Sequence, residues 1–90
     1  MTNEQVAKFL EAGHLAKDNV KIDFKGRQSI VGLFIKLTDY DELKKKNFWR
    51  VVSESHIAKW KESHDNNLAR IFNGSEITRL TKAVEKVSKD

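Results

Sequence analysis

Five basic residues and one tryptophan are the side chains of this sequence best suited to bind a ligand: Lys21, Lys25, Arg27, Lys36, Arg50 and Trp49. Lysine and arginine contact phosphate oxygens, and an exposed indole ring stacks on a nucleobase. Residues 20–37 hold four of the five cations against a single carboxylate, Asp23, in a chain whose net charge is +4. This pattern predicts RNA or another polyanion as a partner.

Trp49 has two alternative roles. If Phe48 and Val52 face the core, alternation along a strand turns Trp49 outward. An outward Trp49 could stack on a base, as could Tyr40. The favoured alternative is that Trp49 packs under an N-terminal helix or in a subunit interface, because aromatic residues concentrate in cores and interfaces.

The three histidines do not form a catalytic or metal-binding pattern. His56 and His64 are eight residues apart, which fits no common zinc spacing, and the sequence contains no cysteine. His64 and Asp65 could form a general base, but no serine stands out as its nucleophile. The sequence also lacks a Gly-rich phosphate loop and a dinucleotide fingerprint. We therefore expect no enzymatic activity, no metal and no cofactor.

Length and composition predict one small domain, residues 1–90. Ninety residues with 39% apolar composition suffice for one modest core. The longest apolar stretch, residues 31–35, is far shorter than the roughly 20 residues of a membrane helix. The N-terminus is polar and acidic, unlike a signal peptide, and the absence of cysteine fits a reducing compartment. We therefore expect a cytoplasmic protein without a membrane partner.

The chain is expected to begin with a helix over about residues 3–12. Thr2 and Gln5 have the spacing of a capping box. One apolar face follows at helical spacing, and Gly13 is placed to end the helix in a left-handed conformation.

The hydrophobic period then changes from 3.6 to 2, which predicts a sheet. Residues 20–24 and 28–37 are expected to form two strands with a turn at Gly26–Arg27, and Gly32 marks a bend or a close approach of the backbone. Residues 38–47 are polar and predict a loop, and residues 48–52 predict a third strand. For residues 53–66, a helical turn capped by Ser55 is favoured over a strand.

Two further strands are expected at residues 68–72 and 75–80. The Asn73–Gly74 dipeptide between them is typical of a tight hairpin, because both turn positions need a positive φ. Apolar residues at helical spacing predict a helical tail over residues 81–90. The order of elements therefore predicts a mainly β fold with α, in which an N-terminal helix precedes a small five-stranded barrel over about residues 19–80.

Two stretches resemble the Sm-like (LSm) proteins, a family of small β-barrels. Residues 20–39 (VKIDFKGRQSIVGLFIKLTD) resemble the first Sm motif, with alternating apolar residues, glycines at Gly26 and Gly32, and a closing Asp39. Residues 71–80 (IFNGSEITRL) resemble the second motif. The resemblance covers about residues 3–80. It implies an Sm-like barrel and a homo-oligomer in which the fourth and fifth strands of neighbouring copies pair.

The sequence departs from the Sm pattern where that family binds bases. Asn73 precedes the glycine of the second motif, where Sm-like proteins typically carry arginine. Their base-binding asparagine near the end of the first motif is not matched by Tyr40, Asp41 or Glu42. The uridine pocket is therefore not implied. Residues 47–52 (NFWRVV) and 68–80 (LARIFNGSEITRL) also resemble a family of short bacterial proteins with no assigned function.

These observations leave two functional hypotheses of different classes. The favoured hypothesis is a nucleic-acid-binding barrel, in which the five cations contact phosphates and Trp49 stacks on a base. The alternative is a protein-interaction or structural homo-oligomeric barrel with no nucleic-acid ligand. The ionic-strength dependence of binding separates them, because phosphate contacts weaken steeply with salt and apolar contacts do not.

Overall fold

An N-terminal helix, α1, spans Asn3–Phe9 and is capped as its sequence predicts. The backbone amide of Gln5 donates to the hydroxyl of Thr2, and the side chain of Gln5 accepts from the backbone amide of Thr2. A wider helical turn, η1 (Leu10–His14), follows, and Gly13 adopts a φ of 121°. The predicted helix start and the left-handed glycine that ends the helix are therefore confirmed.

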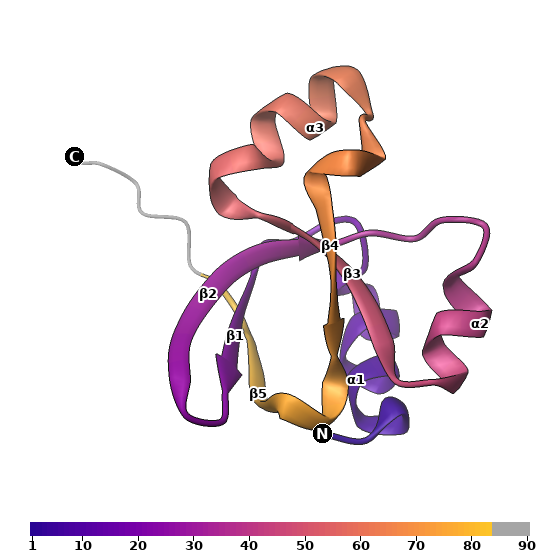
Figure 1. Ribbon diagram of the computed structural model, residues 1–90, viewed down its shortest axis with the longest axis vertical. Coiled ribbons are helices and arrows are strands. Elements are labelled where there is room, and N and C mark those ends of the chain that lie inside the picture. Colours follow the sequence, from indigo (N-terminus) through magenta and orange to yellow (C-terminus); the bar gives the residue numbers. More distant parts are fainter. Residues whose placement is uncertain (84–90) are drawn as a thin grey trace.

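The computed structural model describes residues 1–83, in which five strands form one antiparallel sheet (Figure 1). The strands are β1 (Val20–Phe24), β2 (Arg27–Phe34), β3 (Phe48–Ser53), β4 (Ala69–Asn73) and β5 (Ile77–Lys82). Their order in the sheet is β4-β3-β2-β1-β5. The predicted mainly β fold with helices is confirmed at this level.

Strand β2 is long and strongly curved, and Gly32 permits its close approach to β3 (Figure 1). A Cβ atom at Gly32 would lie 2.9 Å from the carbonyl oxygen of Val52 and would overlap the side chain of Val51. Only glycine fits at such a contact, as the sequence predicts for this position.

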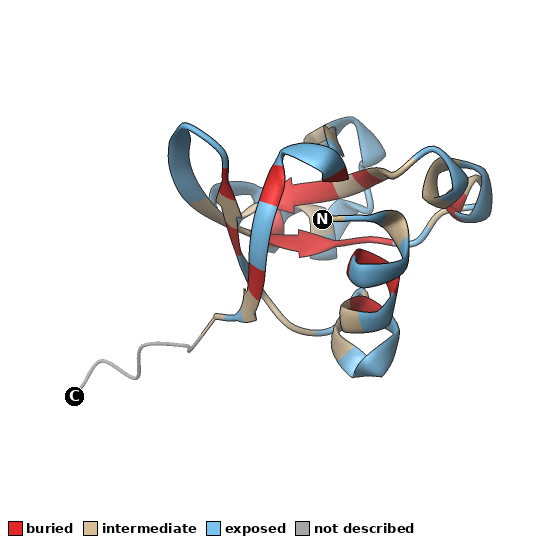
Figure 2. Ribbon diagram, turned by 90° about the horizontal axis from the view of Figure 1, so that it is seen from below, coloured by how far each residue is buried: buried red, intermediate tan, exposed pale blue. Residues whose placement is uncertain are grey.

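Apolar side chains are buried on both faces of the sheet. One face carries Ile22 and Phe34 and packs against α1, which contributes Val6. In Figure 2 the buried positions of α1 face the strands. The other face carries Leu33, Ile35 and Val52 and is covered by Ile57 of α3 (Ile57–Ser63). The predicted alternation along β2, with Phe34 opposite Leu33 and Ile35, is confirmed.

The predicted hairpin between β4 and β5 is wrong. The two strands lie at opposite edges of the sheet and are joined by a 3-10 turn, η4 (Gly74–Glu76). Asn73 caps this turn, because its side-chain oxygen accepts from the backbone amide of Ser75 at 2.9 Å. Gly74 does not have a positive φ. Instead, a Cβ atom at Gly74 would overlap the side chain of Asn47.

The connecting segments differ in part from expectation. Residues 38–47, predicted as a loop, contain the short helix α2 (Tyr40–Lys45), which is anchored by burial of Tyr40. Residues 53–66 are largely helical, as favoured, and contain η2 (Glu54–His56), α3 and the start of η3 (Asn66–Leu68). His56 rather than Ser55 is the N-cap of α3.

The end of the described chain belongs to the sheet. Thr81 and Lys82 lie in β5, so the predicted helical tail does not begin at residue 81. The rest of that prediction, at residues 84–90, falls outside the described residues. Within residues 1–83, no helix is both long and apolar enough to cross a membrane.

Candidate anion-binding cleft

Three of the predicted ligand-binding cations lie on the β1–β2 hairpin. Lys21, Lys25 and Arg27 are all exposed. Lys21 lies on the face of β1 opposite Val20 and Ile22, as alternation predicts. Lys25 lies in the two-residue turn, and Arg27 begins β2.

The other two cations, Lys36 and Arg50, lie near α2, away from the hairpin. Lys36 follows the far end of β2, and its ammonium group lies 5.6 Å from the ring centre of Tyr40. Arg50 Nη2 donates to Asp39 Oδ2 at 2.6 Å. This bond holds the pKa of Asp39 below its ordinary value. Lys36 and Arg50 therefore lie apart from the three cations of the hairpin.

A second group of charges beside α2 is also internally paired. Glu11 accepts hydrogen bonds from Lys44 Nζ at 2.9 Å and from the hydroxyl of Tyr40 at 3.0 Å. These bonds, chiefly that from Lys44, hold the pKa of Glu11 below its ordinary value. Burial, and then the bond to Glu11, raises the pKa of Tyr40. Tyr40 is thus a buried, hydrogen-bonded residue and presents no free ring to a base.

The outward orientation considered for Trp49 is wrong. Trp49 is only 2% exposed and belongs to the core cluster that includes Val6 and Leu10 of α1. Its indole nitrogen donates to Asn47 Oδ1 at 2.8 Å, as expected for a buried tryptophan. Trp49 therefore cannot stack on a nucleobase in this conformation.

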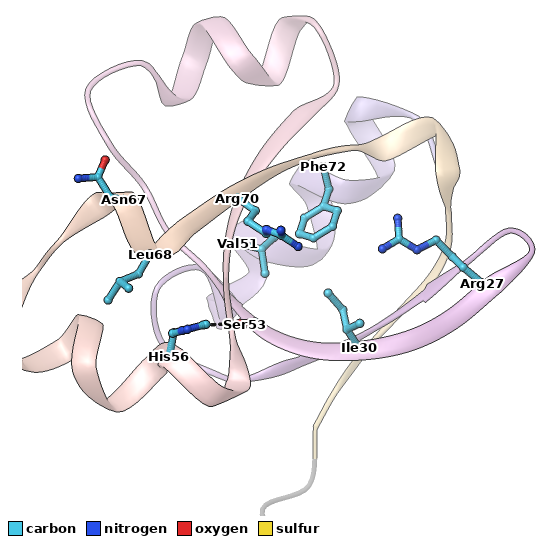
Figure 3. A pocket seen from close by; sticks show the side chains of 9 residues that line it. All are labelled: Arg27, Ile30, Val51, Ser53, His56, Asn67, Leu68, Arg70 and Phe72. Atoms are coloured by element: carbon cyan, nitrogen blue, oxygen red, sulfur yellow. Dashed lines mark hydrogen bonds between the residues drawn. The ribbon is translucent and has the colours of Figure 1, made fainter.

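The structure instead reveals a cleft of about 410 Å³ between β2 and β4 (Figure 3). Val51 of β3 lines it between these two strands, and further residues come from η2 and η3. The nine lining residues are Arg27, Ile30, Val51, Ser53, His56, Asn67, Leu68, Arg70 and Phe72.

Two arginines enter the cleft from opposite walls. In Figure 3 the guanidinium groups of Arg27 and Arg70 point toward each other, with Phe72 between them. The Cζ atom of Arg27 lies 4.6 Å from the ring centre of Phe24 and 5.9 Å from that of Phe72. These rings orient Arg27 through cation–π contacts. Within residues 1–83 neither arginine forms an ion pair.

Polar groups line the other end of the cleft. Ser53 Oγ and His56 Nδ1 lie 2.9 Å apart, whereas the side chain of Asn67 points away from both in Figure 3. Ser53 and His56 do not form a nucleophile–base pair with an oriented base, because no carboxylate of residues 1–83 is hydrogen-bonded to His56. None of the nine described lining residues carries a carboxylate. The cleft therefore combines apolar walls with groups that donate hydrogen bonds to anions.

The sequence interpretation included Arg27 but missed Arg70, His56 and Asn67. Arg70 and Phe72 are two residues apart on β4 and so share a face, which is a signal that alternation alone supplies. His56 and Asn67 carry no such signal, because they reach the cleft only through the turns at η2 and η3. In the part of the chain that is described, no three His, Asp or Glu residues are grouped to hold a metal ion.

Comparison with known proteins does not identify the chain. No protein-family model, curated protein or solved structure matches it.

Proposed function

We propose that this protein is a small, non-catalytic binding module that receives a polyanion, with RNA as the favoured ligand, in the cleft between β2 and β4. One observation carries the proposal. Arg27 and Arg70 enter one partly apolar cleft from opposite walls, His56 lines its other end, and no carboxylate lies among its described lining residues (Figure 3).

The side chains of the cleft have complementary roles in binding a nucleic acid. A guanidinium group presents its N–H donors in a planar fork that matches two phosphate oxygens. Phe72 is half-buried and lies between the two arginines, so its ring is available for stacking with a base (Figure 3). Lys21 and Lys25 on the β1–β2 hairpin add charge without ion pairs among residues 1–83.

Fluorescence anisotropy with a labelled pool of single-stranded RNA, measured over a range of salt concentrations, tests the proposal. If Arg27 and Arg70 each neutralise one phosphate, changing both to glutamate should reduce the log–log salt slope by about 1.4. The affinity should fall as well, while the melting temperature stays close to that of the original protein because both residues are exposed.

The matched control is Lys17→Glu with Lys45→Glu, which makes the same change in net charge at two exposed positions outside the cleft. The proposal requires that this control retain most of the affinity and the salt slope. Equal loss of affinity in both double variants would show nonspecific attraction. Failure of any RNA pool to bind in low salt would overturn the proposal.

We propose a homo-oligomer as a second candidate property, carried by the two edges of the sheet. Within the described residues, β4 pairs only with β3 and β5 pairs only with β1. Unpaired edges promote pairing with another chain. Ile71 of β4 is 49% exposed. Pairing of β4 in one copy with β5 of the next would form the assembly that the Sm-like resemblance implies.

Light scattering measures the molar mass in solution and therefore the number of copies in the assembly. Ile71→Lys should reduce the mass of the assembly, because a lysine on an edge strand opposes edge-to-edge pairing. Ala58→Lys, an exposed substitution on α3, is the control and should leave the mass unchanged. A monomeric mass for the original protein at micromolar concentration would contradict the oligomer and weaken the Sm-like interpretation.

A further inference from the structure

The charge of the cleft suggests which kind of phosphate it selects. Arg27 and Arg70 are two fixed cations among the residues that line the cleft. A phosphate monoester carries a charge of about −1.5 to −2 near neutral pH. An internal phosphodiester carries a single negative charge. Two guanidinium groups, with no carboxylate among the described lining residues, therefore match a monoester more closely.

The hydrogen-bond donors of the cleft lead to the same result. A monoester has three terminal oxygen atoms, each a strong acceptor. Arg27 and Arg70 approach from opposite walls, whereas Ser53 and His56 lie at the end away from the β1–β2 hairpin (Figure 3). The planar forks of two guanidinium groups offer enough N–H donors for three oxygens. A phosphodiester has only two such oxygens, and its second ester bond must continue into the chain.

The size of the cleft limits what accompanies the phosphate. Its volume of about 410 Å³ lies near the lower end of the range for small-molecule sites, about 300–1,000 Å³. Ile30, Val51 and Phe72 supply apolar contacts suited to one flat ring. A single nucleotide fits these features better than a run of stacked bases.

We infer that the cleft binds a terminal phosphate monoester, carried by a nucleotide unit, in preference to an internal phosphodiester. This inference rests on the proposed function, since it specifies the part of the polyanion that enters the cleft. The same chemistry is present at a 5′-phosphorylated end, at a 3′-phosphorylated end and in a free mononucleotide.

Oligonucleotides of one sequence distinguish these sources. One carries a 5′-phosphate, one a 3′-phosphate and one a hydroxyl at both ends, and their affinities are compared by competition against a labelled strand. We expect one phosphorylated form to bind about tenfold more tightly than the hydroxyl form, because its additional contacts are charge-assisted. Adenosine monophosphate should compete more strongly than adenosine.

Arg70→Gln and Arg27→Gln should each remove the preference for the phosphorylated end, whereas the Lys17→Glu, Lys45→Glu control should retain it. Melting temperatures verify that the variants are folded. Equal affinities for all three oligonucleotides would overturn the inference and leave the proposed function standing. Failure of all three to bind would overturn the proposed function itself.

Discussion

Asn47 Oδ1 accepts a hydrogen bond of 2.8 Å from the indole nitrogen of Trp49, and the same residue connects two further segments. Its side-chain amide donates to the carbonyl oxygen of Met1 at 2.9 Å. Its own carbonyl oxygen accepts from the backbone amide of Gly74 at 2.7 Å. Asn47 also has a φ of 62°, a left-handed conformation that asparagine tolerates better than most residues. Through its side chain and its backbone carbonyl, Asn47 therefore joins the N-terminal segment, β3 and η4.

Asn47→Ala should lower the free energy of unfolding by about 2–4 kcal/mol. It leaves the buried indole N–H unpaired, at a cost of about 1–3 kcal/mol, and places a Cβ-bearing residue without a side-chain hydrogen bond in a left-handed conformation, at about 1 kcal/mol. Asn47→Gly removes only the hydrogen bonds and should be less destabilising. Urea denaturation measures both. Equal losses in the two variants would show that the backbone conformation contributes little.

Gly74→Ala should destabilise the protein through its contact with Asn47 and not through its own φ. The added methyl group overlaps the Asn47 side chain, which is held by its hydrogen bonds. The cost of Gly74→Ala should therefore be smaller in an Asn47→Gly background, so the two changes should be non-additive.

Gly26→Ala provides the contrast for this double-mutant cycle. Gly26 has a φ of 64° and open space around it, so its substitution should cost roughly 1 kcal/mol in either background. A Gly74→Ala cost that is the same with and without Asn47 would exclude the contact as its cause.

Asp39→Asn should destabilise the protein at neutral pH and have a diminishing effect in acid. The pKa of Asp39 is lowered by the hydrogen bond from Arg50. A carboxylate with a lowered folded-state pKa stabilises the fold above its unfolded pKa, about 3.9, and this contribution disappears as the pH falls through the folded value. Urea denaturation of both proteins between neutral and strongly acidic pH should therefore give converging stabilities.

The Arg50→Met background supplies the control for this pH dependence. Without the guanidinium donor, Asp39→Asn should have an effect that varies far less with pH. An equally pH-dependent effect in that background would mean that another group stabilises the Asp39 carboxylate.

Ile57→Ala should cost about 2–4 kcal/mol, because it truncates a side chain that is 7% exposed between α3 and the sheet. Lys59→Ala, on the exposed side of the same helix, should change stability by less than about 0.5 kcal/mol. Thermal or urea unfolding measures both. Similar small effects would show that α3 does not contribute to the core.

Local rules were sufficient where neighbours in the sequence decide the structure. The capping box of α1, the turn at Gly26 and the alternation along β2 all follow from short-range geometry. Trp49 was more difficult, because β3 has apolar residues on both of its faces and their pattern does not show which face meets α1. Residues 73–74 have the composition of a hairpin turn, but the contact between Gly74 and Asn47 sets their conformation.

The cleft could not be predicted, because its walls meet only in the folded chain. Arg27 and Arg70 belong to strands that are not neighbours in the sheet, with β3 between them. The local excess of positive charge in residues 20–37 indicated Arg27 as a binding residue. Arg27 and Arg70 line the same cleft only because β2 is curved and β4 follows η3 across the sheet (Figure 1).

Because β3 lies between β2 and β4, the two walls of the cleft are not hydrogen-bonded to each other as neighbouring strands. No ladder hydrogen bonds join the first half of β2 to β4, so the bend of β2 near Gly32 sets the separation of the two walls. A ligand held by both Arg27 and Arg70 would connect β2 to β4. It would restrict the flexing of the sheet, and protection of the β2 amides from hydrogen exchange would rise together with occupancy of the cleft.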